Sequence, residues 1–182
     1  MTQIHTGDPF PQFTFDTAYE ESLDSRSILK GKTVFWVLRY IGCTVCRYDV
    51  HTIAQRYEEF TQKDAQVFVL MQSDAEHIRK DLESNDTKLP FSIICDPSQK
   101  IYKLLDIRAV DSGKELLADR GDDLKEKVGK ANELGFFHGD YEGNEYQLPA
   151  LFIVDEDGMV TYAHYAQNLM DMPVVDEVLN LL

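Results

Sequence analysis

The sequence predicts an α/β fold with a mixed, mostly parallel β-sheet, and two patterns lead to this class. Short apolar runs without polar alternation recur along the chain, which is typical of strands covered on both faces. The segments between them carry apolar residues at three-and-four spacing, the period of an amphipathic helix. With 182 residues and 43% hydrophobic content, the chain is long enough for a substantial core. We therefore expect residues 1–182 to form one domain.

Four apolar runs are the expected core strands: Val34–Leu38, Val67–Met71, Ser92–Ile94 and Ala150–Val154. A long helical pattern, Thr44–Phe60, follows the first of them. The apolar residues on its expected buried side are Val50, Ile53, Ala54, Tyr57 and Phe60. Because strands and helices alternate in this half of the chain, neighbouring strands should run parallel.

Two polar motifs predict where further helices begin. Ser73-Asp74-Ala75-Glu76 has the form of a capping box and would open a helix that runs towards Leu82. Asp96-Pro97-Ser98 is expected to open another helix, with Ile101, Leu104 and Leu105 as its apolar residues. These helices would lie between successive strands of the sheet.

The C-terminal part of the chain reads differently, as a hairpin followed by a helix. Ala150–Val154 and Met159–Ala163 flank Asp157-Gly158, which suits a tight turn. We expect a final helix with Asp171 near its start. Its buried side would carry Val174, Val175, Val178, Leu179 and Leu182. The sheet should therefore be mixed, with an antiparallel edge.

A long polar stretch, residues 110–146, is expected to be an insertion within the domain. Leu117, Leu124, Val128 and Ala131 fall at helical spacing and predict at least one helix there. The following FFHGDYEGNEY reads as an irregular loop that contains aromatic residues. Long connections in compact domains are often functional lids, but a solvated decoration fits the same pattern. Both interpretations stay open at this point.

Composition excludes several classes of partner. The formal net charge is −14, and a polyanion repels nucleic acid phosphates and anionic lipid surfaces. The start of the chain shows no secretory signal, and no apolar run approaches the ~20 residues of a membrane span. Three cysteines are an odd number and do not suggest a disulfide-stapled secreted domain. We expect a soluble, cytoplasmic protein that binds neither nucleic acid nor membranes.

Two of the cysteines form the chemically informative motif, in the stretch YIGCTVCRYD. Cys43 falls where the first core strand ends and the long helix begins, and Cys46 lies on the first helical turn. A helix N-terminus offers unpaired N–H groups and partial positive charge, which stabilise a thiolate. The spacing also brings the two sulfurs close enough for a disulfide bond. Redox chemistry at Cys43 and Cys46 is therefore the favoured interpretation.

Two alternatives compete with redox chemistry. A zinc site would need Cys43 and Cys46 together with distant donors such as His51 and Cys95, and no second Cys/His pair has suitable spacing. Two merely buried cysteines are also common, but a junction flanked by Arg39 and Arg47 does not favour an inert pair. We expect no metal, and we expect Cys95 to be an inert buried thiol.

Four segments, taken in order, resemble the peroxiredoxin-like branch of the alkyl hydroperoxide reductase/thiol-specific antioxidant (AhpC/TSA) family of the thioredoxin-fold superfamily. They are GDPFPQFTF, GKTVFWVLRYIGCTVC, LPFSIICDPSQKIYKLLDI and LPALFIVDEDGMVTYAHYA. The resemblance covers most of the chain. It implies a thioredoxin-like three-layer α/β/α fold with a mixed sheet, and an insertion before the C-terminal hairpin. It also implies an antioxidant oxidoreductase that needs no bound cofactor.

The chain departs from the family pattern at the residues that bind peroxide. Typical peroxiredoxins read Pro-x-x-x-Thr/Ser-x-x-Cys, and their final cysteine attacks peroxide. By this resemblance Cys46 takes the attacking place, Cys43 the Thr place and Arg39 the Pro place. The family's second active-site arginine falls at Pro149. Arg39 offers a substitute charge.

The replacements are similar to thioredoxin, which pairs a Cys-x-x-Cys motif with a proline before a core strand. This resemblance implies a cis Leu148–Pro149 bond, with the backbone before it facing the cysteines. Arg39, Leu148 and Pro149 are therefore the expected substrate-positioning residues. Thioredoxin's buried acid has no match in Val34–Leu38, so the base that assists the second cysteine stays unidentified.

Together these features favour a thiol-disulfide oxidoreductase. Cys43 would attack a disulfide, Cys46 would resolve the mixed intermediate, and an external thioredoxin- or glutathione-like thiol would reduce the resulting pair. One alternative is a thiol-dependent peroxidase in which Cys46 is oxidised by peroxide and Cys43 resolves it. Another is a non-enzymatic redox sensor or binding domain. His138 and His164 would approach the site only if the insertion folds over it.

Overall fold

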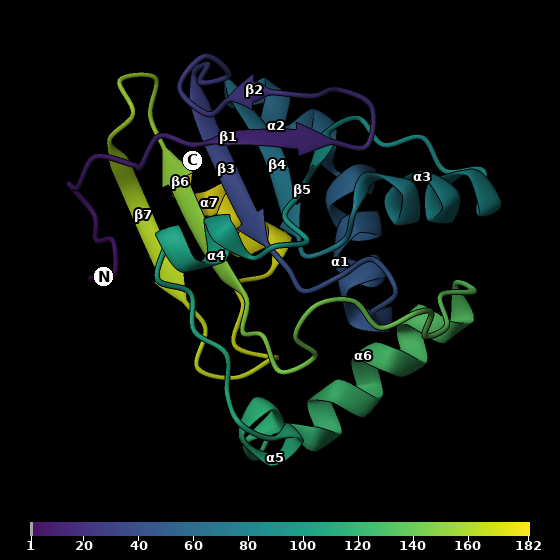
Figure 1. The fold of residues 1–182 in the computed structure, drawn as a ribbon. Helices are drawn as coiled ribbons and strands as arrows, with labels where there is room; N and C mark the ends of the chain where they lie inside the picture. The colour runs from purple at the N-terminus through teal and green to yellow at the C-terminus, as the bar shows by residue number, and fades with distance from the viewer. Residues whose placement is uncertain (1) are drawn as a thin grey trace.

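The computed structural model describes residues 2–182 and forms three layers, a central β-sheet with helices on both faces (Figure 1). The sheet has seven strands in the order β2-β1-β5-β4-β3-β6-β7. Strands β3, β4 and β5 are parallel, whereas β6, β7, β1 and β2 pair antiparallel with their neighbours. The expected mixed α/β sheet of thioredoxin type is confirmed, and both of its edges are antiparallel.

The strands of the core lie where the apolar runs predict them, within a few residues. Their bounds are β3 Lys32–Val37, β4 Ala65–Met71, β5 Ser92–Cys95, β6 Ala150–Val154 and β7 Val160–Tyr165. Two short strands were not expected, β1 Thr14–Thr17 and β2 Leu23–Asp24. They contain few apolar residues because each is short and close to the surface.

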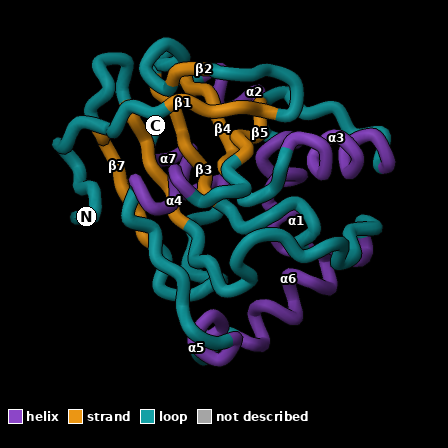
Figure 2. The backbone as a smooth tube through the Cα atoms, in the orientation of Figure 1, coloured by secondary structure: helices purple, strands orange, loops and turns teal. Residues whose placement is uncertain are grey.

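Side-chain alternation along β3 divides the core into two apolar clusters. Val34 and Trp36 face one cluster. It is covered by helices α1 (Thr44–Gln55), α2 (Tyr57–Gln62), α3 (Ala75–Ser84) and α7 (Val175–Leu181). Phe35 and Val37 face the other, which is covered by α4 and by phenylalanines of the N-terminal segment. Because both faces are covered, β3 reads as a continuous apolar run and not as an alternating one. Figure 2 shows the strands enclosed between these layers.

The long helical pattern after β3 forms two helices, not one. Helix α1 is Thr44–Gln55 and helix α2 is Tyr57–Gln62. The break is at Arg56, whose backbone leaves helical geometry (φ −113°, ψ 14°). Phe60 is nevertheless fully buried, so the predicted apolar face is correct across the break.

Helix α3, Ala75–Ser84, follows β4, and helix α4, Lys100–Leu104, follows β5. The capping residue of α3 is Asp74, whose carboxylate accepts a hydrogen bond from the His77 N–H (2.8 Å). Ser73, which begins the expected capping box, instead hydrogen-bonds Ile41 and Glu142. The helix therefore begins one residue later than the motif suggests.

The last helix, α7, is Val175–Leu181 and begins later than the sequence predicts. Asp171 does not open it, and its carboxylate accepts a hydrogen bond from the Gln167 N–H (2.8 Å). Pro173 explains the difference, because the residue before a proline is disfavoured in helical conformation. The predicted buried side of the helix is correct for Val175, Val178 and Leu179. It is wrong for Val174, which is 60% exposed because it is the N-cap residue and lies outside the helix.

The stretch 110–146 contains the helix that the spacing predicts, and a shorter one before it. These helices are α5 Gly113–Leu117 and α6 Gly121–Glu133. Helix α6 packs beside α1 (Figure 1), and Ala131 is fully buried there. Residues 135–146 that follow are irregular. In residues 2–182 no helix is long and apolar enough to cross a membrane.

Candidate active site

The two cysteines lie at the carboxyl edge of the parallel strands. The loop that joins β3 to α1, residues 38–43, is called the cysteine loop below. The Leu38 N–H donates to the Leu70 carbonyl (2.9 Å), which continues the pairing of β3 with β4. The Ile41 N–H donates to the Ser73 hydroxyl (2.8 Å). These bonds hold the loop in place and put Cys43 at the N-cap of α1.

Cys43 and Cys46 are brought together as the motif predicts. Cys46 lies on the first turn of α1, and the two residues approach to 2.8 Å. Neither is in a disulfide bond within the described chain. Their exposed fractions are only 3% and 2%, so this conformation covers both sulfurs.

The environment makes the two thiols unequal. Burial by itself raises the pKa of Cys43, but the hydrogen bond from the Cys46 thiol, the Arg39 charge and the Cys46 backbone N–H lower it to about 7. Burial raises the pKa of Cys46 well above its ordinary value, and its hydrogen bond to Cys43 raises it further. Cys43 is thus the thiolate of the pair near neutral pH, and Cys46 keeps its proton.

Arg39 is the buried cation of the site. Its side chain is 6% exposed, and its Nη2 donates to the Tyr40 hydroxyl (2.9 Å). The guanidinium carbon lies 5.0 Å from the centre of the Tyr40 ring. Burial lowers the pKa of Arg39, but the two cysteines and Tyr40 together more than offset this effect, so the pKa is raised overall. Its buried Nε–H has no hydrogen-bond partner among the described residues, so one donor is available for a substrate oxygen.

A half-buried acid that sequence reasoning missed lies one helical turn beyond Cys46. The Asp49 carboxylate forms an ion pair with Lys127 of helix α6 (2.5 Å), and each side chain is 20% exposed. Burial raises the pKa of Asp49, and the Lys127 charge opposes the rise. The negative charge of Asp49 in turn raises the pKa of Cys43. The spacing of Cys46 and Asp49 places both on one face of a helix, which is a signal that the sequence contains. The ion pair with Lys127 has no such signal, because Lys127 is distant in the sequence.

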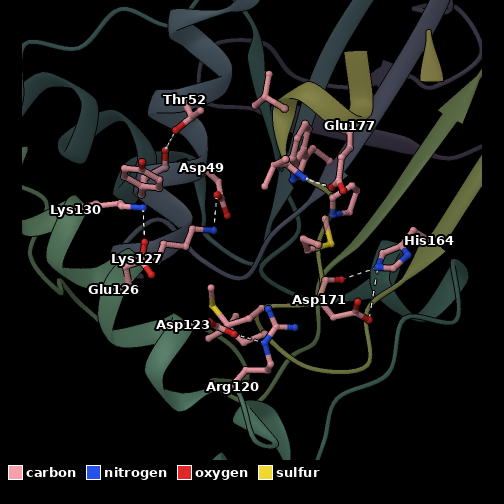
Figure 3. A pocket seen from close by; sticks show the side chains of 18 of the residues that line it. Asp49, Thr52, Arg120, Asp123, Glu126, Lys127, Lys130, His164, Asp171 and Glu177 are labelled. Atoms are coloured by element: carbon pink, nitrogen blue, oxygen red, sulfur yellow. Dashed lines mark hydrogen bonds and ion pairs between the residues drawn. The ribbon is translucent and has the colours of Figure 1, made fainter. Parts of the chain in front are cut away.

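Asp49 also lines a cavity of about 980 Å³ (Figure 3). The cavity lies between α1, α6, β7 and the segment before α7. His164 lies at its far side, where its Nε2 hydrogen-bonds the Asp171 carbonyl (2.6 Å). His164 therefore belongs to this cavity wall, together with Trp36 of β3.

Leu148 and Pro149 precede β6, which begins at the edge where β3 ends, since Val37 pairs with Ala150. Leu148 is buried in the same apolar cluster as the cysteines. The expected cis bond is wrong, because residues 2–182 contain no cis peptide bond. The extended chain runs directly into β6. The Leu148 N–H donates to the Arg108 backbone carbonyl (3.2 Å), and the Pro149 carbonyl accepts from the Ala166 N–H (3.2 Å).

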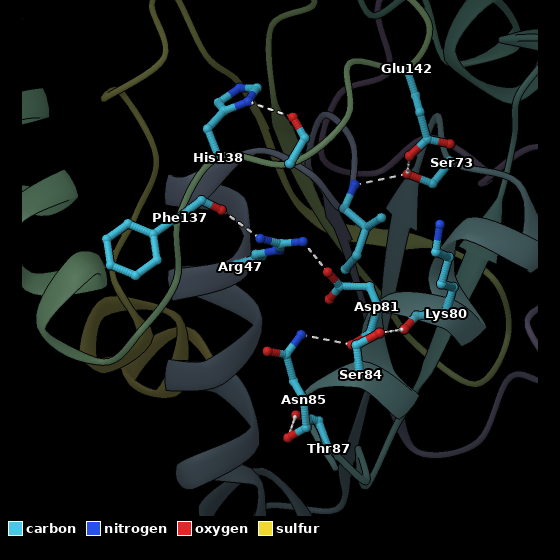
Figure 4. Close-up of polar contacts among 12 residues, drawn as sticks. Arg47, Ser73, Lys80, Asp81, Ser84, Asn85, Thr87, Phe137, His138 and Glu142 are labelled. Atoms are coloured by element: carbon cyan, nitrogen blue, oxygen red, sulfur yellow. Dashed lines mark hydrogen bonds and ion pairs between the residues drawn. The ribbon is translucent and has the colours of Figure 1, made fainter.

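The end of the stretch 110–146 folds over the cysteine loop. Gly139 and Gly42 are joined by a backbone hydrogen bond of 2.8 Å, and the His138 Nε2 lies 3.2 Å from the Tyr40 hydroxyl. Arg47 on α1 donates from Nη1 to the Phe137 carbonyl, and its Nη2 pairs with the Asp81 carboxylate (Figure 4). Sequence spacing could not identify the contacts of residues 137–139, because they join segments 90 or more residues apart.

The remaining candidate residues are not gathered at the cysteine pair. His51 packs against Phe136, with ring centres 5.3 Å apart. Cys95 ends β5, and burial raises its pKa to about 12. Among the described residues, the one group with metal-ligand geometry contains neither of them nor Cys43 or Cys46. It consists of Asp74, His77 and Glu142.

Comparison with known proteins gives a family match over most of the chain. The model of the AhpC/TSA family matches residues 6–163. No curated protein matches the sequence. The structure is similar to peroxidoxin BcpB from Mycobacterium tuberculosis, with a TM-score of 0.67, 14% identity, and coverage of 98% of this chain and 96% of that one.

Two further similar structures are peroxiredoxins. A mitochondrial 1-Cys peroxiredoxin from yeast has a TM-score of 0.67 and 18% identity, covering 97% of this chain and 74% of its own. A mutant of peroxiredoxin 6 from Arenicola marina has a TM-score of 0.69 and 16% identity, covering 97% and 70%. At such identities the likeness establishes the fold.

Proposed function

Because the chain belongs to the AhpC/TSA family, it is an oxidoreductase that works through cysteine thiols, and from this premise we propose that it is a thiol-dependent peroxidase. The sequence alone favoured disulfide exchange, and family membership supports the peroxidase alternative instead. The observation that carries the proposal is the position of Cys43 at the N-terminus of α1 beside a buried arginine, whose charge helps to lower the pKa of the thiol.

The proposed reaction begins with attack by the Cys43 thiolate on one peroxide oxygen. An S–O bond forms, the O–O bond breaks, and the second oxygen leaves as water or an alcohol once it is protonated. Cys43 is then a sulfenic acid. Cys46 loses its proton and attacks the Cys43 sulfur, the S–O bond breaks, and the hydroxide leaves as water. The product is a Cys43–Cys46 disulfide, and the peroxide has been reduced by two electrons.

Arg39 has the role of positioning the peroxide in this scheme. Its unpartnered Nε–H, among the described residues, offers a hydrogen bond to a peroxide oxygen. Its positive charge favours both the thiolate and the negative charge that develops on the departing oxygen. Leu148 and Pro149, which directly precede β6, would supply the apolar wall of the same site.

Two thiols of an external reductant would complete the cycle. The thiolate of the first attacks the Cys43–Cys46 disulfide, and the second releases the reduced enzyme as a new disulfide forms in the reductant. The similar yeast protein is described as resolved through glutathione/thioredoxin systems. We propose a thiol reductant of one of these two types for this chain, and no bound cofactor.

The nucleophile is tested with the matched variants Cys43→Ser and Cys46→Ser. After peroxide is added, we expect Cys46→Ser to accumulate sulfenic acid on Cys43, detected by dimedone labelling and mass spectrometry. Cys43→Ser should react no faster than free cysteine. The reverse result would assign peroxide attack to Cys46, as the family position implies. If neither variant reacts while wild type rapidly reduces a disulfide substrate, the enzyme is a disulfide reductase. Absence of turnover with either substrate would indicate a redox sensor.

A further inference from the structure

Residues 137–144, called the strap below, lie directly on the cysteine loop. The Gly139 N–H donates to the Gly42 carbonyl (2.8 Å). A Cβ atom on Gly42 would lie 2.1 Å from the Asp140 carbonyl oxygen, which is far inside van der Waals contact. Gly42, next to Cys43, is therefore the point at which the strap meets the loop without any intervening side chain.

A second contact joins the strap to the buried arginine of the site. Arg39 donates to the Tyr40 hydroxyl (2.9 Å), and the same hydroxyl lies 3.2 Å from His138 Nε2. The His138 Nδ1 lies 2.8 Å from the Gly139 carbonyl. Because that contact places the ring proton on Nδ1, Nε2 is the acceptor and Tyr40 the donor. Tyr141 also packs against Tyr40, with ring centres 5.9 Å apart.

Further polar contacts hold both ends of the strap (Figure 4). At its start, the Phe137 carbonyl accepts from Arg47 Nη1 (2.5 Å). Towards its end, Glu142 accepts from the Ser73 hydroxyl (2.7 Å). Asn144 donates to the Gln72 side chain (2.7 Å). Each of these hydrogen bonds contributes only a small net free energy, because water replaces the lost partner when the strap opens, so these contacts can be broken locally.

The outer side of the strap is open to solvent, unlike its inner side. Phe137 is 62% exposed and Tyr141 is 66% exposed. In contrast, Tyr40 is fully buried beneath it. A segment with few buried apolar contacts of its own opens at lower free energy than the core around it. The strap can therefore lift while the sheet and α1 stay folded.

We infer that the strap controls which reagents reach the cysteine pair, and that a thiol reductant reaches it only when the strap lifts. This inference rests on the proposed function, because it assigns the reductant a path to the Cys43–Cys46 disulfide. Thiol–disulfide exchange requires the attacking sulfur to contact a disulfide sulfur directly. With the strap seated, both sulfur-bearing residues are almost fully covered.

Gly42→Ala tests the inference with one added methyl group. The φ of Gly42 is not in the left-handed region, so alanine meets no backbone strain and clashes only with the strap. Gly129→Ala is the matched control, because Gly129 lies in α6 and its Cβ would meet no described atom within 4 Å. His138→Ala is a second variant, which loosens the strap by removing its Tyr40 contact and adds no bulk.

The measurement is the labelling rate of the reduced cysteines with iodoacetamide and with a maleimide on a long polyethylene glycol chain. For Gly42→Ala and His138→Ala we expect bulky labelling to accelerate about tenfold relative to iodoacetamide, which corresponds to an easier opening of the strap. Gly129→Ala should match wild type. Circular dichroism and thermal unfolding verify that each variant is folded.

Equal ratios of bulky to small labelling in wild type and both variants would overturn the inference. If Gly42→Ala does not fold, His138→Ala decides the question by the same ratio. Labelling does not depend on peroxide turnover, so a protein without peroxidase activity but with an accelerated ratio would contradict only the proposed function.

Discussion

At the scale of single residues, the reactivity of Cys43 is set by two opposite charges. Arg39 lowers the pKa of the Cys43 thiol, and Asp49 raises it. Arg39 lies in the cysteine loop, two residues after β3 ends, whereas Asp49 is on α1 and is paired with a lysine of α6. Helix α6 therefore contributes to the electrostatics of the site through Lys127, which partly neutralises the acid.

Exchanging each charge for a neutral side chain should move the Cys43 pKa in opposite directions. We expect Asp49→Asn to lower it, because a nearby negative charge is removed, and Arg39→Met to raise it. At a pH below the thiol pKa, a change of one unit in that pKa changes the thiolate population about tenfold. The pH dependence of iodoacetamide labelling at the peptide of Cys43 measures both shifts, with Arg108→Met as an arginine control. Shifts of the same sign in the two variants would contradict this assignment.

Single residues also show where sequence reasoning succeeds and where it ends. The spacing of Cys43 and Cys46 and their place at a strand end were sufficient to predict the pair. Asp49 was missed because its significance depends on its partial burial and on its ion pair with Lys127, which is distant in the sequence. The resemblance to thioredoxin placed Pro149 correctly at the strand start but predicted the wrong isomer of its peptide bond.

At the scale of elements, one buried carboxylate organises the start of α4. Asp96 is 4% exposed, and it accepts hydrogen bonds from the N–H groups of Lys100 (2.9 Å), Ile101 (2.7 Å) and Tyr102 (3.2 Å). These are the donors that a helix start leaves unpaired. The Tyr102 hydroxyl reaches back to the Leu38 carbonyl (2.6 Å) at the beginning of the cysteine loop.

Asp96→Ala should therefore destabilise the protein by about 2–3 kcal/mol, because three helix donors lose a charged partner. Urea unfolding followed by circular dichroism gives this difference. Asp157→Ala, in the turn between β6 and β7, is an exposed control and should change stability by less than about 0.5 kcal/mol. Equal effects of the two substitutions would show that Asp96 does not organise α4.

Helices and strands with a clear pattern of apolar residues were predictable, and short strands that are defined only by their pairing with a neighbour were not. The core strands and the helix in the insertion follow from apolar spacing. The strands β1 and β2 are four and two residues long, too short for a period to be read. The break at Arg56 and the late start of α7 depend on local backbone geometry, and only the second has a sequence signal, Pro173.

At the scale of the whole molecule, the cysteine pair couples stability to pH. The folded pKa of Cys43 is about 7 against an ordinary value of 9.0. Between these values the unfolded chain binds more protons than the folded one, so stability rises with pH. The contribution is complete above pH 9 and is lost as pH falls through 7. Cys46 has the opposite sign and lowers stability only above pH 9, because its folded pKa is raised.

Reduced wild type should gain about 1–3 kcal/mol of unfolding free energy relative to Cys43→Ser between pH 6.5 and 9, from the difference between the two pKa values. Urea unfolding of both proteins under reducing conditions, at several pH values, measures the difference. A gap between wild type and variant that does not change with pH would contradict the lowered pKa.

The order of the sheet was predictable only in part, because sequence reveals that strands exist but not which edge each one joins. The parallel centre follows from alternating strands and helices. The seating of the insertion on the cysteine loop depends on contacts between residues such as Gly42 and Asp140, which no local pattern contains. Whether 110–146 was lid or decoration therefore could not be decided from spacing.

The position of Trp36 gives the protein an optical reporter. It is the one tryptophan of the chain, it is 2% exposed, and it packs in the apolar cluster that contains Cys43 and Cys46. Disulfides quench indole emission at short range, so the fluorescence of this single residue should fall as the pair oxidises and recover on reduction. Each half of the catalytic cycle can then be followed in a stopped-flow instrument on unmodified protein, without a dye or a coupled enzyme.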